Sequence, residues 1–207
     1  MRKLLLIFAV LLLSMQNLCA QTGNVVLDNP KERPLVLLDN EIVPFEMLEQ
    51  IPSDTIARIT VIDRETARFF YKKKGKFGAI QILTKPYLEE IQKRISQREN
   101  SEHHPTGKER PALWPGGEKG MHSYVYSHVV YPTDAIEMGV QGTVIVRFKV
   151  NAEGKVESPM IVQSLFQSCD MEVLRVLAHM DKWTPALDSD GNPVSVYFTL
   201  PVAFRLE

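Results

Sequence analysis

The chain has 207 residues, of which 44% are hydrophobic and 24% are charged, and its formal net charge is −1. This composition is that of an ordinary globular protein, and it excludes disordered and collagen-like chains. The small net charge gives no general attraction to nucleic acid, so we expect no nucleic-acid partner. The two cysteines are too few for a disulfide-stapled scaffold or a four-thiolate zinc site.

The first twenty residues have the pattern of a secretory signal peptide. Arg2 and Lys3 precede an apolar run over residues 4–13, and Ala20 is a small residue suited to cleavage. Such a run rises only about 15 Å as a helix, which is about half of a bilayer span. We therefore expect export to the periplasm, and the alternative is an uncleaved inner-membrane anchor facing the periplasm. Lipidation at Cys19 is disfavoured because the two residues before it are not small.

Composition divides the chain into four parts. Residues 1–20 are the leader, 21–85 a small α/β module, 86–112 a charged helix and linker, and 113–207 a second folded domain. The helix is expected over residues 87–98, whereas the polar residues 100–111, with Gly and Pro, indicate a linker. Cleavage of the leader leaves Cys169 as the lone cysteine, so both modules must be held by their cores alone.

The N-terminal module alternates strands with short helices. Apolar and β-branched runs predict strands at residues 35–38, 59–62 and 79–84, and helical segments are expected at residues 46–51 and 65–71. Asp39-Asn40 closes the first strand with a turn. Lys72, Lys73, Lys74 and Lys76 surround a glycine, which predicts a solvated loop, with contact to anionic lipid or an acidic partner as the alternative.

The C-terminal domain shows the order helix, strand, strand, helix, strand. Residues 143–150 and 156–162 predict a hairpin around the turn at residues 151–154, and residues 194–206 predict a long alternating strand. Helices are expected at residues 134–138 and 170–180, the second capped by Asp170. The predicted fold class is α+β, with an antiparallel three-stranded sheet and two helices on one face, preceded by the small α/β module.

Short motifs follow in a fixed order along residues 113–207. They are Trp114-Pro115-Gly116-Gly117-Glu118, Tyr131-Pro132, Gln141-Gly142-Thr143-Val144, Phe148-Lys149-Val150, Gly154, Lys182-Trp183-Thr184-Pro185-Ala186 and Leu200-Pro201-Val202. Their order and spacing resemble the TonB C-terminal domain, in the form found in Bacteroidetes proteins. The resemblance implies a non-enzymatic periplasmic protein that takes part in energy-coupled transmembrane transport. We interpret Tyr131, Pro132, Gly142, Gly154, Trp183 and Pro185 as structural motif residues.

A second resemblance covers residues 34–85. Its motifs are Pro34-Leu35-Val36-Leu37-Leu38-Asp39-Asn40, Ile51-Pro52-Ser53-Asp54, Ile59-Thr60-Val61-Ile62 and Gly78-Ala79-Ile80. They look like the plug domain of TonB-dependent receptors. We therefore expect this module to be a plug-like interaction module.

The TonB resemblance implies binding by β-strand addition, in which an extended segment of an outer-membrane receptor pairs with an open sheet edge. We expect this edge in the last strand, because Pro201 removes a backbone donor and is typical of edge strands. The expected partner-binding residues are Val194, Ser195, Val196, Tyr197, Phe198 and Thr199. A homodimer or a merely solvated edge is the alternative use of this strand.

The resemblance also implies an inner-membrane proton-channel complex as a partner, which requires an uncleaved leader. A cleaved leader, and a linker with only Pro105 and Pro111, depart from the family pattern. The alternative function is therefore an envelope adaptor or structural interaction module without energy transduction.

We expect no catalytic residues, no metal site and no cofactor. His103 and His104 lie in the linker, while His122 and His128 are six residues apart in a predicted helix and face different sides. Cys169, ten residues before a histidine, lacks a third orienting group. The sequence contains no nucleophile elbow, phosphate loop or dinucleotide fingerprint.

The leader gives a first testable prediction. We expect the mature protein to begin at Gln21, because the apolar run is too short to span a bilayer. Mass spectrometry of the intact protein purified from its native envelope measures this directly. A chain that retains Met1 would contradict cleavage and favour the anchored alternative.

Overall fold

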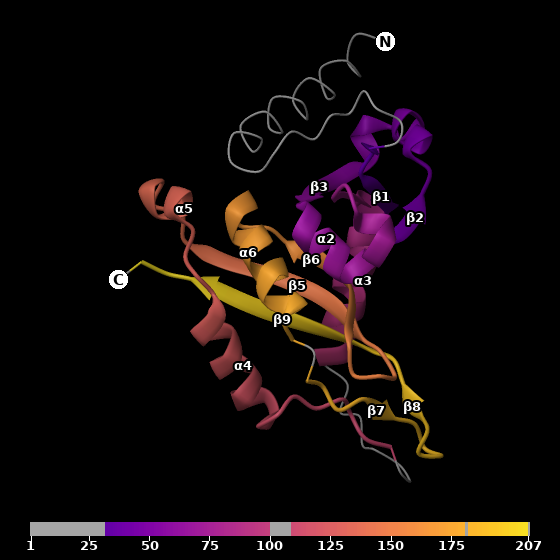
Figure 1. Ribbon diagram of the computed structural model, residues 1–207, viewed down its shortest axis with the longest axis vertical. Helices are drawn as coiled ribbons and strands as arrows, with labels where there is room; N and C mark the ends of the chain where they lie inside the picture. Colours follow the sequence, from indigo (N-terminus) through magenta and orange to yellow (C-terminus); the bar gives the residue numbers. More distant parts are fainter. Residues whose placement is uncertain (1–31, 100–108, 181, 207) are drawn as a thin grey trace. The chain divides into compact units, whose positions relative to one another are not determined.

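The structure is a computed structural model that describes residues 32–99, 109–180 and 182–206. The predicted leader and most of the predicted linker lie outside the described residues. The chain divides into two compact units, Met1–Tyr87 and Leu88–Glu207. Both are drawn in Figure 1, and each is described here by itself. Within the described residues, no helix is both long and apolar enough to cross a membrane.

The N-terminal unit is built on a four-stranded sheet with the order β2-β1-β4-β3. β1 and β4 run parallel, and the other two pairs are antiparallel. The elements are β1 (Leu35–Leu38), β2 (Glu41–Val43), η2 (Phe45–Gln50), η3 (Ser53–Thr55), β3 (Ile56–Ile62), α2 (Arg64–Tyr71), η4 (Lys72–Gly75) and β4 (Ala79–Thr84). The helix α3 (Lys85–Glu99) follows directly.

The turn between β1 and β2 explains an element that the sequence patterns missed. Asp39 and Asn40 both have positive φ, 51° and 70°, as a tight hairpin turn requires. The turn therefore sends the chain back as β2, which pairs with β1 although it is only three residues long. The Asp39 carboxylate also accepts hydrogen bonds from the backbone N–H and the hydroxyl of Thr84, both at 2.8 Å. This residue thus ties the end of β1 to the end of β4.

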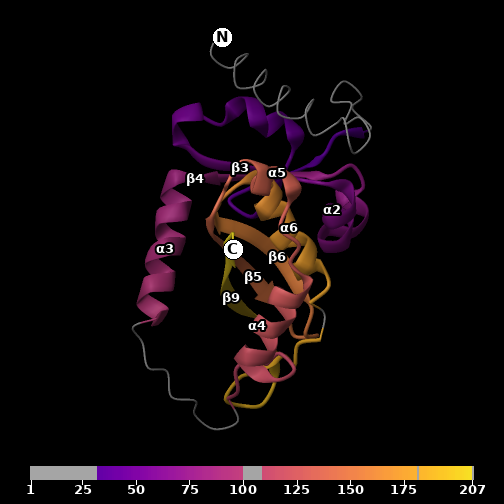
Figure 2. The same ribbon diagram turned by 90° about the vertical axis from the view of Figure 1, so that its left-hand side faces the viewer.

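The C-terminal unit contains the expected three-stranded antiparallel sheet, with the order β6-β5-β9. Its elements are α4 (Gly117–His128), α5 (Thr133–Glu137), β5 (Gly142–Val150), β6 (Val156–Gln163), α6 (Gln167–Ala178), β7 (Ala186–Leu187), β8 (Pro193–Val194) and β9 (Val196–Phe204). Figure 2 shows the three long strands side by side, with α6 beside β5 and β6. The predicted α+β fold is confirmed. The helix predicted around His122 and His128 is α4, and the β7–β8 ribbon is an additional element.

The core of the C-terminal unit lies between the sheet and α6. Val144, Val146, Phe148 and Val150 alternate along β5, and all four are completely buried, as their spacing predicts. α6 begins at Gln167, three residues earlier than expected, so Asp170 lies inside the first turn and does not cap the helix. Its buried carboxylate instead accepts hydrogen bonds from the Ser164 hydroxyl and the Leu165 N–H.

Three of the predicted motif residues meet at one close contact. Gly154 has φ 77°, and a Cβ atom built on it would lie 2.0 Å from the Trp183 carbonyl oxygen and 3.7 Å from Cδ of Pro185. Only glycine therefore allows the β5–β6 turn to pack against the backbone before β7.

Gly154→Ala should destabilise the protein more than Gly139→Ala, which serves as its matched control. Both glycines have positive φ, but a Cβ on Gly139 would meet nothing within 4 Å. We expect Gly139→Ala to cost about 1 kcal/mol from backbone strain alone, and Gly154→Ala about 3 kcal/mol because the Trp183 backbone must also move. Urea denaturation measures both free energies of unfolding. Equal costs would show that the close contact is unimportant.

Candidate functional site

β9 lies at an edge of the C-terminal sheet. It pairs along its whole length with β5, in an unbroken antiparallel register from Gly142↔Phe204 to Val150↔Val196. No other strand within the described residues pairs with the outer side of β9. An edge strand of this kind presents a row of backbone donors and acceptors to its surroundings. β9 is therefore the candidate binding edge.

The register decides which backbone groups of β9 point outward. Pro201 faces Ile145 and has no N–H to donate, so this pair cannot be one of the hydrogen-bonded pairs of the ladder. Thr143 is an odd-numbered residue of β5, like Ile145. Its carbonyl accepts a hydrogen bond at 3.0 Å from the side chain of Gln163 on β6. Odd-numbered residues of β5 thus point their backbone groups toward β6, and odd-numbered residues of β9 point theirs outward.

The outward row consequently comprises the backbone groups of residues 197, 199, 201 and 203. Even-numbered residues hold the strand to β5, and their side chains Leu200, Val202 and Phe204 are buried in the core. Thr199 and Ala203 contribute both a donor and an acceptor to the outer edge, whereas Pro201 contributes only its carbonyl. The edge thus extends beyond Thr199, where the expected binding residues end.

The other edge of the sheet is irregular. The pairing of β6 with β5 shifts register twice, between Ile145 and Val146 and between Arg147 and Lys149. Ser158 on β6 has φ 50°, and Pro159 follows it. Each edge strand contains a proline, Pro159 or Pro201, but only the β6 edge also has bulges, a device by which sheet edges avoid pairing with other chains. β9 is therefore the better template for an added strand.

The structure corrects two of the expected binding residues. Val194 belongs to β8, where it pairs with Ala186 of β7, and Ser195 lies between β8 and β9. The reason is the turn at residues 188–192, in which the Asp188 carboxylate accepts hydrogen bonds from the backbone of Asp190 and Asn192. This turn folds Val194 back onto β7, so the regular edge begins only at Val196. Val196, Tyr197, Phe198 and Thr199 do lie in β9.

Aromatic side chains fix β9 at both ends. The ring of Trp183 lies 4.6 Å from that of Phe198 and 5.5 Å from that of Trp114. At the other end the ring of Tyr131 meets Phe204 edge-on at 5.3 Å, and the Tyr131 hydroxyl donates a hydrogen bond to the Val140 carbonyl. Such aromatic pairs add to the stability that burial alone provides.

Pro132 and Gly142, two further motif residues, make local contacts at the start of α5 and β5. Pro132 precedes α5, and its carbonyl accepts a hydrogen bond from the N–H of Ile136. Gly142 begins β5, and a Cβ built on it would lie 2.6 Å from a methyl carbon of Leu165. Pro132 precedes α5 and Gly142 belongs to β5, so neither is part of the outward row of β9.

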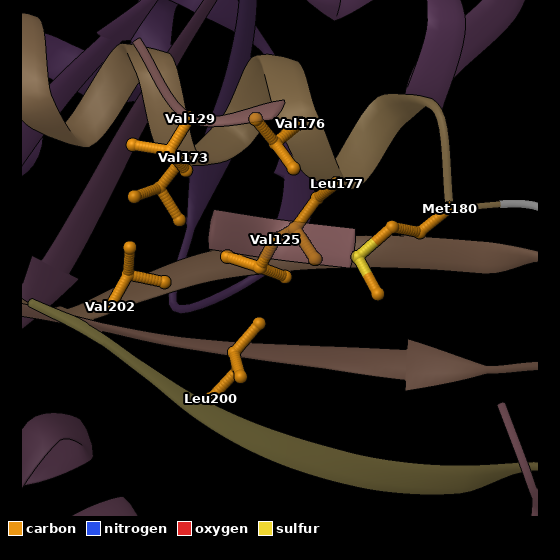
Figure 3. A pocket seen from close by; sticks show the side chains of 8 residues that line it. All are labelled: Val125, Val129, Val173, Val176, Leu177, Met180, Leu200 and Val202. Atoms are coloured by element: carbon orange, nitrogen blue, oxygen red, sulfur yellow. The ribbon is translucent and has the colours of Figure 1, made fainter. Parts of the chain in front are cut away.

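A small apolar recess lies on the inner face of β9. It leaves no room for a water molecule, and side chains from α4, α6 and β9 converge on it in Figure 3. The lining residues are Val125, Val129, Val173, Val176, Leu177, Met180, Leu200 and Val202. The lining side chains offer no hydrogen-bonding group that could orient a small-molecule ligand. We interpret the recess as a packing seam that holds α4 and α6 against the strand.

The outer face of the sheet carries paired charges. Arg147 stacks on the ring of Tyr197 at 4.4 Å, and the Lys149 ammonium lies 3.0 Å from the Glu157 carboxylate. Partial burial raises the pKa of Glu157, but hydrogen bonds from Lys149 and Asn151 outweigh this and bring the pKa below its ordinary value. The Lys149–Glu157 pair is therefore ionised at neutral pH.

Within the part of the chain that the structure describes, Cys169 and His179 lie in different environments. Burial, with a further contribution from the charge of Asp170, raises the pKa of Cys169 to about 11, so the thiol stays protonated at neutral pH. His179 is exposed, and its Nδ1 lies 2.9 Å from the Arg175 carbonyl. Nowhere in residues 32–99, 109–180 or 182–206 do three histidine, cysteine or acidic side chains form a group that could hold a metal ion.

Comparison with known proteins identifies the domain that contains β9. Residues 127–206 match the family described as Gram-negative bacterial TonB protein C-terminal. A solution structure of the TonB C-terminal domain of Helicobacter pylori, residues 179–285, is 21% identical and covers 42% of this chain and 78% of that chain, with a TM-score of 0.34. A shorter form, residues 194–285, is 23% identical and covers 42% and 89%, with a TM-score of 0.32. No curated protein matches the chain. Residues 127–206 thus form a domain of the TonB C-terminal type, and β9 is its last strand.

Proposed function

We propose that this protein is a periplasmic TonB-like protein that binds segments of outer-membrane receptors by β-strand addition to β9. In this role it contributes to energy-coupled transport across the outer membrane. The family match over residues 127–206 supports the TonB-like role. The regular, nine-residue β9 at the edge of the sheet is the observation that carries the proposed mode of binding.

The geometry of the edge defines what it can bind. The outward row runs over residues 197–203, so a partner segment of about seven residues in extended conformation matches its length. Hydrogen bonds between main chains supply the affinity, and they depend little on the identity of the partner's side chains. This edge therefore suits a partner whose segment is unstructured before it binds.

Transduction of energy requires a connection to the inner membrane. In the proposed TonB-like role this connection is the leader as an anchor, together with an inner-membrane proton-channel complex. If the leader is cleaved, the same edge serves an envelope adaptor or structural interaction module that joins partners without transmitting force. The N-terminal unit, which we propose to be a plug-like interaction module, is compatible with either role.

Thr199→Pro tests the edge through the backbone. The outward N–H of Thr199 disappears in this variant. The hydrogen bonds between β9 and β5 remain, because residue 199, like Pro201, points its backbone groups away from β5. We expect the affinity for receptor N-terminal peptides encoded in the same genome to fall about tenfold. Isothermal titration calorimetry measures this change. Thr199→Val is the matched control, since it alters the side chain but keeps the N–H, and its affinity should stay within about threefold.

NMR spectroscopy of the labelled chain separates strand addition from the adaptor alternative. Addition of a receptor peptide should shift the amide signals of Thr199 and Ala203 most, because their N–H groups acquire new acceptors. Shifts confined to β6, or no shifts, would contradict binding at β9. Shifts of the same β9 amides that grow with protein concentration and without peptide would assign the edge to a homodimer.

A further inference from the structure

A cluster of positive charges covers one side of the N-terminal unit. Six basic residues, here called the basic patch, are Arg64, Arg68, Lys72, Lys73, Lys74 and Lys76, and all six are exposed. Arg64 and Arg68 are four residues apart on α2 and therefore lie on one face of the helix, and Lys72 follows its last turn. Residues 64–76 contain one acidic residue, Glu65, so six positive charges and one negative charge give a local net charge of +5. The net charge of the whole chain, −1, conceals this concentration.

The basic patch is displayed on a fixed turn. η4 folds back on α2 so closely that a Cβ on Gly75 would lie 2.2 Å from the Ala67 carbonyl oxygen. Lys72 has φ 55°, and its N–H donates to the Arg68 carbonyl at the end of the helix. The N–H of Gly78 then donates to the Gly75 carbonyl at 3.1 Å. The backbone that carries the lysines of η4 is thus packed against α2.

Helix capping accounts for only one of these charges. The Lys72 ammonium donates a hydrogen bond to the Phe69 carbonyl at 3.0 Å, where a positive charge also stabilises the helix dipole. Among the described residues, no carboxylate forms an ion pair with the side chains of Arg68, Lys73 or Lys74. Uncompensated like charges on a rigid turn repel one another, so an external anionic partner would relieve this repulsion.

An exposed aromatic ring lies inside the basic patch. Phe69 is 38% exposed, and the Lys72 ammonium lies over its ring at 5.2 Å. The Lys76 ammonium similarly lies over the ring of Phe77 at 4.9 Å. At a membrane surface, an aromatic ring of this kind enters the boundary between head groups and acyl chains, while neighbouring ammonium groups contact lipid phosphates. An acidic polypeptide would bury Phe69 only if it also carried apolar side chains, whereas an anionic lipid layer always offers both phosphates and an apolar boundary.

We propose that the basic patch docks the N-terminal unit on an anionic lipid surface, with the cations on phosphate head groups and Phe69 in the interface. This inference is independent of strand addition, because all of its residues belong to the N-terminal unit. Among the alternatives for the lysine run, which were a solvated loop, anionic lipid and an acidic partner, the proposal takes anionic lipid. It also adds Arg64, Arg68 and Phe69 to the surface.

Vesicle flotation of the full chain tests the proposal. We expect binding to vesicles that contain phosphatidylglycerol to exceed binding to pure phosphatidylcholine vesicles, and to weaken as salt is added. Arg2 and Lys3 of the leader also favour anionic lipid, but they are present in every variant, so the difference between variants on phosphatidylglycerol vesicles reports the basic patch. Lys73→Gln with Lys74→Gln should lower the partition coefficient on phosphatidylglycerol vesicles about 30-fold.

Lys93→Gln with Lys119→Gln is the matched control, because it removes two exposed positive charges outside the basic patch. It should change partitioning by less than about threefold. Phe69→Ser should also lower partitioning while leaving its salt dependence intact. Thermal melting checks that all variants remain folded, and exposed side chains should leave it unchanged.

Three results would overturn the proposal. Equal binding to both lipids would exclude recognition of anionic head groups. An equal loss of partitioning in the control and in the patch variant would show that the net charge of the protein, and not the basic patch, determines binding. Displacement from vesicles by polyglutamate at charge concentrations below those of the lipid would assign the surface to an acidic polypeptide.

Discussion

The pairing of β9 with β5 is the interaction on which the C-terminal domain depends. Their register is unbroken over nine residues, so the same alternation that buries Leu200, Val202 and Phe204 also turns the backbone of every second residue outward. Stability and availability for binding are therefore two consequences of a single register. A slip by one residue would move the apolar side chains to the outer face and exchange the bonded and outward rows together. A substitution that shifts the register of β9 would therefore disturb the binding edge and the core together.

Several motif residues of the domain pack against β9 or against the segments that hold it. Trp183 holds Phe198 at the start of β9, Tyr131 holds Phe204 at its end, and Gly154 lets the Trp183 backbone approach the β5–β6 turn. None of these contacts occupies the outer side of β9. The most distinctive residues in the sequence are thus those that fix the strand, whereas the proposed binding groups are ordinary main-chain atoms. A search for unusual side chains alone would therefore miss the candidate site.

Periodic patterns predicted the long elements well, because burial on one face imposes alternation in β5 and β9 and helical spacing in α6. They failed where a local turn overrides the pattern. Val194 continues the alternation of β9 in sequence, yet the hydrogen bonds of Asp188 fold it onto β7. Asp170 has the side chain of a helix cap, but α6 begins earlier and uses its carboxylate to hold Ser164 and Leu165. β6 and β9 each contain a proline, Pro159 and Pro201, so the sequence marks both as edge strands, and the shifts of register that distinguish the two edges required coordinates.

The two proposed surfaces differ in their physical basis, and this difference has a consequence for the whole chain. Main-chain pairing at β9 is short-ranged and insensitive to salt, whereas attraction of the basic patch to an anionic surface extends over about a Debye length, 8–10 Å, and weakens with salt. Each interaction is modest alone. Because both surfaces belong to one chain, attachment of one raises the effective concentration of the other near a membrane, provided that the connecting segment allows both to engage. A receptor segment presented at a membrane would then meet β9 at a local concentration that neither surface could achieve by itself.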